Sequence, residues 1–480
     1  MAKEEKIGIT AKKDKHFSEW YTQVMIKSEL ADYTEVSGCI VFRPGSYAIW
    51  EKIRDYCDKE FKKTGVKNAY FPLLIPEKLL SKEAEHVEGF TPEVAWVTEA
   101  GNTKLAERLA VRPTSETIMY DSYSKWIRSW RDLPLKLNQW NNVVRWEFKH
   151  PVPFLRTREF LWNEGHTVYA TEKEADAERD IILNIYINCL KELMALPCLP
   201  GKKSDKEKFA GAEASYSLEC YLPNGKAIQG PDFHSDGQNF AEAYNIKFID
   251  KDEKEQYAYQ NTWAITTRMI GVMLAIHSDD KGLVIPPKLA ENKAVIVPII
   301  FGDDTKEAIL KEAKSLEKEL KDFNPILDDR DDKTAGWKFN EWELKGIPIR
   351  IEIGPRDLEK NQVIVVRRDT LKKEPIKLKD LKKQIPVILE SIHNDLYKKA
   401  GNLLKNNITK AEKWNDLAKS IKDQKIVLAP WCTTTACEES IKEKTGAKTL
   451  NMPLDQKSVK GKCINCDKPA KAYVYIGKSY

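Results

Sequence analysis

The stretch QWNNVVRWEFKHPVPFLRTREFLWNEGH, residues 139–166, determines the fold expected for the region around it. Apolar and aromatic residues alternate with charged residues on both sides of a loop that contains Pro151 and Pro153. This alternation is typical of half-buried strands, and proline is excluded from the middle of a sheet because it has no N–H for the ladder. The pattern therefore predicts a β-hairpin that carries Arg145 and Arg156 on neighbouring strands, with aromatic rings between them.

The chemistry of this hairpin has two interpretations. Two guanidinium groups with a stacking ring suit a nucleoside triphosphate, because forked donors match phosphate oxygens and a flat ring covers the base. Glutamates in the same stretch would instead pair with the arginines on an ordinary solvated hairpin. The charge pattern alone leaves both interpretations open; the glutamates are Glu147, Glu159 and Glu164.

The whole chain has 480 residues, of which 42% are hydrophobic, enough for two or three cores. Its net charge of +5 permits a polyanionic partner without demanding one. No apolar run approaches the ~20 residues of a membrane span. The charged start MAKEEKIGITAKKDK has no signal-peptide core. We therefore expect a cytoplasmic protein with no membrane contact, whose residues 1–15 form a mobile basic tail.

The chain beyond Ile285-Pro286-Pro287 is expected to form separate units. Strands and helices alternate there, which predicts a small α/β domain with a mostly parallel sheet. Residues 337–346 interleave aromatic and basic residues, a pattern that suits unstacked RNA bases but suits an amphipathic helix better. The expected elements are a strand over 294–301, a helix over 306–320, strands over 347–353 and 363–366, and a Lys-rich helix over 378–402.

Four of the nine cysteines form two close pairs near the end of the chain: Cys432 with Cys437, and Cys463 with Cys466. The odd total and the scatter of the other cysteines are typical of a reduced compartment rather than of a disulfide framework. Two close pairs match tetrahedral thiolate ligation of zinc, although the first gap is wider than the commonest spacing. Four unrelated buried cysteines are the alternative, and the turn-forming residues around Cys466 favour zinc.

Several segments, in order, carry a resemblance to one enzyme family. The pattern R-x-E at Arg145, a loop, and R-x-R-E-F ending at Phe160 resemble motif 2 of the class II aminoacyl-tRNA synthetases. With LAVRPTSETIMY at residues 109–120, the chain resembles the prolyl-tRNA synthetases of the archaeal and eukaryotic type. The resemblance extends from about His16 to Tyr480, which is nearly the whole chain.

The resemblance implies a fold and a division of the chain. It implies an α+β catalytic domain on an antiparallel sheet at residues 16–290, an α/β anticodon-binding domain at 291–395 and a small C-terminal zinc-binding α/β domain at 396–480. A helix over 46–63 followed by a strand over 69–74 resembles motif 1 of the class, which builds the dimer interface, so a homodimer is implied. Arg268, just before an apolar helix, resembles the arginine of motif 3.

The resemblance also implies an activity and the residues that carry it. ATP and L-proline would form prolyl-adenylate, with Mg²⁺ at the nucleotide, and the prolyl group would then pass to the 3′ end of tRNA(Pro). Arg145 and Arg268 would be catalytic. The implied proline-binding residues are Thr114, Glu116, Arg145, Trp162, Glu164, His166 and His234. The implied ATP-binding residues are Arg145, Glu147, Arg156, Phe160, Gln229, Asp232, Thr266 and Arg268.

Two further segments are interpreted through the family. Residues 206–213, KEKFAGAE, resemble a loop that closes over bound proline, and only a short segment separates them from the hairpin. The large editing domain of the bacterial branch therefore has no place in between. Tyr480 resembles a terminal tyrosine whose carboxylate relatives direct toward the catalytic domain.

Other features keep alternatives open. Thr114–Glu116 precede a helical run over 118–130, and by themselves these residues favour a capping box. Within Pro231–His234 the chain has Asp232 where relatives carry threonine, so the ribose contact would fall to a carboxylate beside a triphosphate. The alternative functions are a tRNA-binding or regulatory relative without activity, and a class II synthetase for another amino acid.

Overall fold

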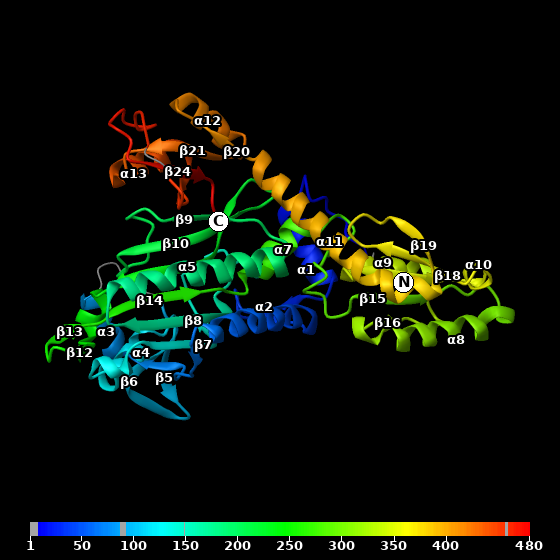
Figure 1. The fold of residues 1–480 in the computed structure, drawn as a ribbon, viewed down its shortest axis with the longest axis horizontal. Coiled ribbons are helices and arrows are strands. Elements are labelled where there is room, and N and C mark those ends of the chain that lie inside the picture. The colour runs from blue at the N-terminus through cyan, green and yellow to red at the C-terminus, as the bar shows by residue number, and fades with distance from the viewer. Residues whose placement is uncertain (1–7, 87–92, 148, 457–458) are drawn as a thin grey trace.

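The computed structural model describes residues 8–86, 93–147, 149–456 and 459–480, which form three units in chain order (Figure 1). The first unit holds the large sheet, the second lies beside it, and the long helix α11 leads from the second unit to the third. Within the described part of the chain, no helix has the length and apolar composition that crossing a membrane requires.

The first unit is built on an eight-stranded sheet in the order β23-β9-β10-β11-β14-β8-β7-β3. Its neighbouring strands pair antiparallel except β3 with β7, which confirms the expected antiparallel α+β fold. Helices α2 (Pro44–Lys63), α5 (Glu172–Asn188) and α7 (Arg268–His277) share one apolar core with this sheet. The strands are β3 (Lys67–Asn68), β7 (Leu135–Val144), β8 (Glu159–Tyr169), β9 (Leu199–Lys202), β10 (Ala214–Tyr221), β11 (Ala227–Gly237), β14 (Tyr259–Ala264) and β23 (Met452–Pro453).

The predicted hairpin exists as β7 and β8, but the prediction that Arg145 and Arg156 lie on its strands is wrong. Strand β7 ends at Val144 and β8 begins at Glu159, so both arginines lie in the connection. The Arg145 N–H still donates to Arg158 O at 2.8 Å, which continues the ladder by one step. A tight turn closed by a bridge between Val152 and Arg156 then takes the chain out of register.

The remaining elements of the first unit flank this sheet. The prediction of a strand over 69–74 is wrong, because residues 69–73 lie between β3 and β4, outside both strands. A three-stranded sheet in the order β4-β6-β5 lies beside them. The elements are α1 (Phe17–Lys27), β1 (Ala31–Tyr33), β2 (Ile40–Phe42), β4 (Leu74–Pro76), α3 (Glu77–His86), β5 (Trp96–Ala100), β6 (Thr103–Val111), α4 (Glu116–Trp126), α6 (Asn239–Tyr244), β12 (Lys247–Ile249) and β13 (Glu255–Tyr257).

The second unit has a five-stranded sheet in the order β16-β15-β17-β18-β19. Only the pairings of β15 with β16 and with β17 are parallel, so the expected mostly parallel sheet is in fact mixed. A parallel crossover needs a dozen or more residues, and the connections after β17 and β18 are shorter than that. The elements are β15 (Ala294–Pro298), α8 (Asp303–Glu319), β16 (Ile326–Leu327), α9 (Ala335–Lys345), β17 (Ile349–Ile353), α10 (Pro355–Glu359), β18 (Gln362–Arg367) and β19 (Lys373–Lys377).

Helix α9 exists as the amphipathic interpretation predicts, but it buries Lys338, Glu343 and Leu344 and leaves its tryptophans half-buried. Trp342 Nε1 donates to Asp328 Oδ2 at 2.8 Å. Helix α11 (Leu378–Asn406) then passes through the predicted boundary between residues 395 and 396. The third unit follows, with a sheet in the order β20-β21-β24-β22. Its elements are β20 (Ile408–Lys410), α12 (Trp414–Lys422), β21 (Ile426–Trp431), α13 (Thr435–Thr445), β22 (Lys448–Thr449) and β24 (Ala472–Gly477).

The basic start of the chain was predicted to be mobile, and for residues 8–15 this is wrong; residues 1–7 lie outside the described part. Lys13 is anchored at the end of α7, where its Nζ donates to Ile276 O at 3.1 Å and to Ser278 O at 2.6 Å. The carbonyls at a helix C-terminus have no partner within the helix and attract a cation. Burial lowers the pKa of Lys13 to about 7.

Candidate functional site

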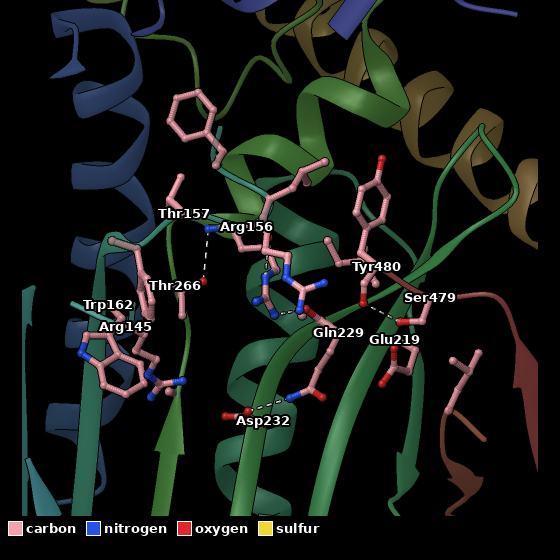
Figure 2. A pocket seen from close by; sticks show the side chains of 18 of the residues that line it. Arg145, Arg156, Thr157, Trp162, Glu219, Gln229, Asp232, Thr266, Ser479 and Tyr480 are labelled. Carbon is pink, nitrogen blue, oxygen red and sulfur yellow. Dashed lines mark hydrogen bonds between the residues drawn. The ribbon is translucent and has the colours of Figure 1, made fainter. Parts of the chain in front are cut away.

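Two adjoining cavities open over strands β8, β11 and β14, with volumes of about 310 and 230 Å³. We call them the larger and the smaller pocket. One wall is common to both, because the same residues line each of them: Arg145, Trp162, Gln229, Asp232 and Ala264. Figure 2 shows the larger pocket, with Arg145 and Trp162 on one side and Ser479 and Tyr480 on the other.

Arginines dominate the larger pocket. Arg268, at the start of α7, is held by the backbone: its Nε donates to Leu155 O and its Nη1 to Gln229 O, both at 3.0 Å. Burial, together with the positive charges of Arg145 and Arg156, lowers the pKa of Arg268. An anion that neutralises these guanidiniums would relieve that repulsion, so the arginines of the pocket suit a polyanion.

Arg145 stands at the junction of the two pockets. Its Nε donates to Pro113 O at 3.0 Å, and its guanidinium lies over the rings of Trp162 and Phe160, 5.0 and 5.5 Å from their centroids. These contacts orient the group so that one guanidinium faces both cavities. A ligand that bridged the two pockets would therefore meet Arg145 at its reacting centre.

The larger pocket also contains carboxylates. Asp232 Oδ2 accepts from Gln229 Nε2 at 2.8 Å and lies 3.7 Å from His234 Nε2. Glu219 is buried and pairs with the equally buried Lys203 at 2.8 Å. The sequence analysis missed this pair: only the strand register that sets Glu219 opposite Gln229 brings it to the pocket. Together with Glu147, these carboxylates line the same cavity as the arginines.

The smaller pocket is acidic at its base. The Thr114 hydroxyl donates to Glu116, and the Ser115 hydroxyl donates to Glu164. Ser115 occupies the N-cap position of α4, but its side chain makes no capping bond. The capping-box interpretation is therefore wrong, because the hydroxyls are used to organise two buried carboxylates.

These two carboxylates differ in proton affinity. Burial raises the pKa of Glu116. Burial acts on Glu164 in the same direction, but its bonds with His166, Ser115 and Asn141 prevail and lower its pKa. The ligand atoms of Glu116, Glu164 and His166 lie within 4.8 Å of one another. A small cation that donates hydrogen bonds fits this cluster, because it would favour the ionised form of Glu116.

His234 forms part of the wall between the smaller pocket and residues 203–213. Its Nδ1 lies 2.7 Å from Ser215 Oγ, and its ring lies 4.8 Å from that of Phe209. Phe209 and Glu207 both line the smaller pocket. They belong to the segment expected to resemble a closing loop, although neither was named as a site residue.

The pockets gather every residue expected to bind ATP or proline, whose roles remain predictions. The expected residues that line the larger pocket are Arg145, Glu147, Arg156, Phe160, Trp162, Gln229, Asp232, Thr266 and Arg268. Those that line the smaller pocket are Thr114, Glu116, Arg145, Trp162, Glu164, Gln229, His166, Asp232 and His234. Lys448, Leu450, Ser479 and Tyr480 reach the larger pocket from the third unit, and only Tyr480 was expected near it.

The four cysteines of the third unit converge on one point, apart from both pockets. Cys432 follows β21, Cys437 lies in the first turn of α13, and Cys463 and Cys466 lie on one tight loop. The Sγ atoms of Cys463 and Cys437 are 4.0 Å apart and those of Cys466 and Cys432 are 3.7 Å apart. A zinc tetrahedron with Zn–S bonds of about 2.3 Å has edges of about 3.8 Å. The four thiols therefore fit a zinc ion.

Three family profiles match the chain in order. Residues 96–277 match the tRNA synthetase class II core domain (G, H, P, S and T). Residues 293–387 match an anticodon binding domain, and residues 414–480 match the prolyl-tRNA synthetase C-terminal domain. The three matches lie in the first, second and third units, respectively.

Individual relatives match over the full length. Proline–tRNA ligase 2 of Bacillus cereus is 48% identical over 482 residues, covering 100% of both chains. A proline–tRNA ligase of Alkaliphilus oremlandii is 50% identical, covering 97% of this chain and 96% of the relative. The crystal structure of prolyl-tRNA synthetase from Cryptosporidium parvum, complexed with halofuginone and AMPPNP, matches with a TM-score of 0.95 and 46% identity, covering 99% of this chain and 100% of that one.

Proposed function

The chain belongs to the prolyl-tRNA synthetase family, and we propose that it activates L-proline with ATP and transfers the prolyl group to tRNA(Pro). The observation that carries this proposal is the junction at Arg145, where an arginine-rich pocket meets an acidic one. The arginine-rich pocket suits the triphosphate of ATP and the acidic pocket suits the ammonium of proline, so the two substrates would meet at Arg145. The family's structure with AMPPNP, an ATP analogue, supports ATP as the nucleotide.

In the proposed first step, the proline carboxylate attacks the α-phosphate of ATP and pyrophosphate leaves. The reaction needs no side-chain nucleophile, so catalysis consists of alignment and stabilisation of developing charge. Arg145 would hold the carboxylate and the α-phosphate together, while Arg156 and Arg268 would hold the outer phosphates. Phe160 would cover the adenine ring, with Gln229 and Thr266 completing the nucleotide site. The intact arginines argue against a relative without activity.

We propose that Mg²⁺ accompanies the triphosphate. This ion prefers carboxylate oxygens and phosphates as ligands, and Glu147, Glu219 and Asp232 line the same pocket as the arginines. A divalent cation would also offset the charge of Asp232, at the position where the resemblance implies threonine. The acidic residue then becomes compatible with a bound triphosphate.

We propose that the secondary ammonium of proline binds in the smaller pocket between Glu116 and the Thr114 hydroxyl. A carboxylate both accepts its hydrogen bond and balances its charge. Trp162, His166 and His234 would surround the apolar ring, and Glu164 would hold Ser115 and the Thr114 hydroxyl in place through bonds of 2.8 and 3.2 Å.

The proton affinity of Glu116 leads to a pH dependence. Because burial raises its pKa, Glu116 binds a proton more readily than an ordinary glutamate. The cationic amine needs the ionised form, so KM for proline should fall as the pH rises through this pKa. Pyrophosphate exchange at a series of pH values measures it. A Glu116→Gln variant should bind proline weakly with no such slope, and the same slope in both proteins would contradict the assignment.

The activity itself is tested by amino-acid-dependent ATP–pyrophosphate exchange, with each amino acid in turn. We expect exchange with proline above all others. Exchange that requires another amino acid would assign the chain to a different class II specificity. Aminoacylation of tRNA(Pro) tests the second step, which the match of the second unit to an anticodon binding domain supports.

We propose that the four cysteines hold a structural Zn²⁺. The fit of their Sγ separations supports this, and four thiolates leave no open position for catalysis. We also propose the catalytic, anticodon-binding and zinc-binding divisions at residues 16–290, 291–395 and 396–480. Helix α11 would then join the last two rigidly.

We propose a homodimer and a cytoplasmic location. Large apolar side chains are exposed around β4 and β5, among them Tyr70 at 72%, and such groupings mark interfaces. The others are Leu73, Leu74 and Trp96. Light scattering should give a mass near twice 55.2 kDa. A monomer at micromolar concentration would contradict the dimer.

A further inference from the structure

Residues 203–213, which we call the pocket loop, connect β9 to β10 and supply one wall of the smaller pocket. Glu207 and Phe209 line that pocket. The Phe209 N–H donates to Ser215 Oγ at 2.8 Å, and the same oxygen lies 2.7 Å from His234 Nδ1. The position of the loop therefore sets the shape of the amino-acid site.

The pocket loop is held from outside by the third unit. Ser204 Oγ donates to Glu438 Oε1 at 3.0 Å, in a buried contact. Lys448 Nζ lies 2.7 Å from Glu207 Oε2. Lys206 Nζ lies 2.7 Å from Glu439 Oε1. All three partners belong to α13 and β22 or directly flank them, so one small unit holds the loop at three points.

The third unit is itself docked firmly beside this loop. Strand β23 extends the large sheet by pairing with β9, directly before the loop begins. Buried Asn451 donates to Leu199 O at 2.9 Å and to Ser217 O at 3.1 Å, which ties it to both neighbouring strands. A side chain at Gly201 would meet Asn451 and Met452 at 2.5 Å, so the two surfaces are in direct contact.

The three loop contacts differ in weight. In the pair of Lys206 and Glu439 the Glu439 side chain is 52% exposed, and pairs at the surface contribute little. Lys448 and Glu207 are two-thirds or more buried, and Glu438 is buried and also accepts from the Thr449 hydroxyl. Lys448 in addition lines the larger pocket. Lys448 and Glu438 therefore make the contacts that contribute most to holding the pocket loop.

We propose that the third unit closes the pocket loop over the bound amino acid, with Lys448 and Glu438 as positioning residues. This rests on the proposed function for the identity of that amino acid. Loss of either contact would free the loop to open, which costs binding of the amino acid. The arginines that act on the phosphates lie on other elements, so the chemical step should change little.

The first test is a double-mutant cycle in proline-dependent pyrophosphate exchange. Lys448→Ala should raise KM for proline about 10-fold, the scale of one charge-assisted hydrogen bond. Glu438→Gln, whose side chain lines neither pocket, should raise KM for proline while kcat and KM for ATP stay nearly unchanged. Once Lys448 is gone, Glu207→Ala should add little. Lys419→Ala, an exposed lysine of α12 in the same unit, is the matched control and should behave as wild type.

The second test measures the loop without activity. In Lys448→Ala and in Glu438→Gln, amide hydrogen exchange should accelerate in residues 203–213 and stay unchanged in β10 and β11. Unchanged exchange in the loop, or independent effects of Lys448→Ala and Glu207→Ala on KM, would overturn the proposal. A wild-type protein that shows no proline-dependent exchange would instead overturn the proposed function, while the loop measurement would still decide this inference.

Discussion

Replacing Arg145 with alanine is expected to lower proline-dependent pyrophosphate exchange by at least ~10²-fold, the scale for removing one donor that acts in the transition state. Arg145 is the cationic group shared by both pockets, and its Nε bond to Pro113 O and its contacts with Trp162 and Phe160 orient it toward the junction. The negative charge on the oxygens around the five-coordinate α-phosphorus of the transition state would develop there. Most of the loss should therefore fall on kcat.

The lysine variant separates charge from geometry. Arg145→Lys keeps the positive charge but loses the planar fork that would hold a carboxylate and a phosphate at once, so it should recover only part of the rate. Arg356→Ala, an exposed arginine of the second unit, is the matched control for removing a guanidinium. Thermal melts establish that each variant is folded. An Arg145→Ala enzyme with nearly wild-type exchange would remove Arg145 from the reaction.

The Cys463→Ser, Cys466→Ser double variant is expected to lose one zinc ion per chain and to unfold the third unit at a lower temperature. The loop with Cys463 and Cys466 brings two of the four sulfurs to Cys432 and Cys437, and the Ile464 N–H donates to Pro430 O at 2.9 Å. Structural zinc contributes about 10–16 kcal/mol of apparent binding energy to small domains, and this is also folding energy. The apolar core around the site is small and includes cysteines themselves.

Elemental analysis and differential scanning calorimetry measure these effects. Exchange activity should fall as well, because the third unit contributes Lys448, Leu450, Ser479 and Tyr480 to the larger pocket. Cys39→Ser, a cysteine outside the cluster, should keep the metal and the melting profile. A wild-type preparation without zinc and with undiminished stability would establish the cysteines as ordinary buried residues.

The sequence by itself determined the features that depend on local spacing. Alternation around residues 139–166 predicted the hairpin of β7 and β8, and helical periodicity predicted α2 and α8 close to their observed bounds. The two cysteine pairs predicted a four-thiol cluster, because short gaps already bring each pair together. Motifs in a fixed order identified the family, and the resemblance to that family named the site residues that line the pockets.

Only the tertiary structure decided what depends on contacts between distant segments. Arg145 and Arg156 lie outside the two strands because a tight turn shortens the hairpin, and the alternation of residue types does not predict that turn. The sequence predicts that Lys13 is mobile, and this prediction fails because its partners, carbonyls at the end of α7, lie more than 250 residues away along the chain. Lys203 with Glu219, and Lys448 with Glu207, meet only because β9, β10 and β23 are neighbours in one sheet. Strand pairing between units has no signature in local spacing, and the proposed closure of the amino-acid site rests on it.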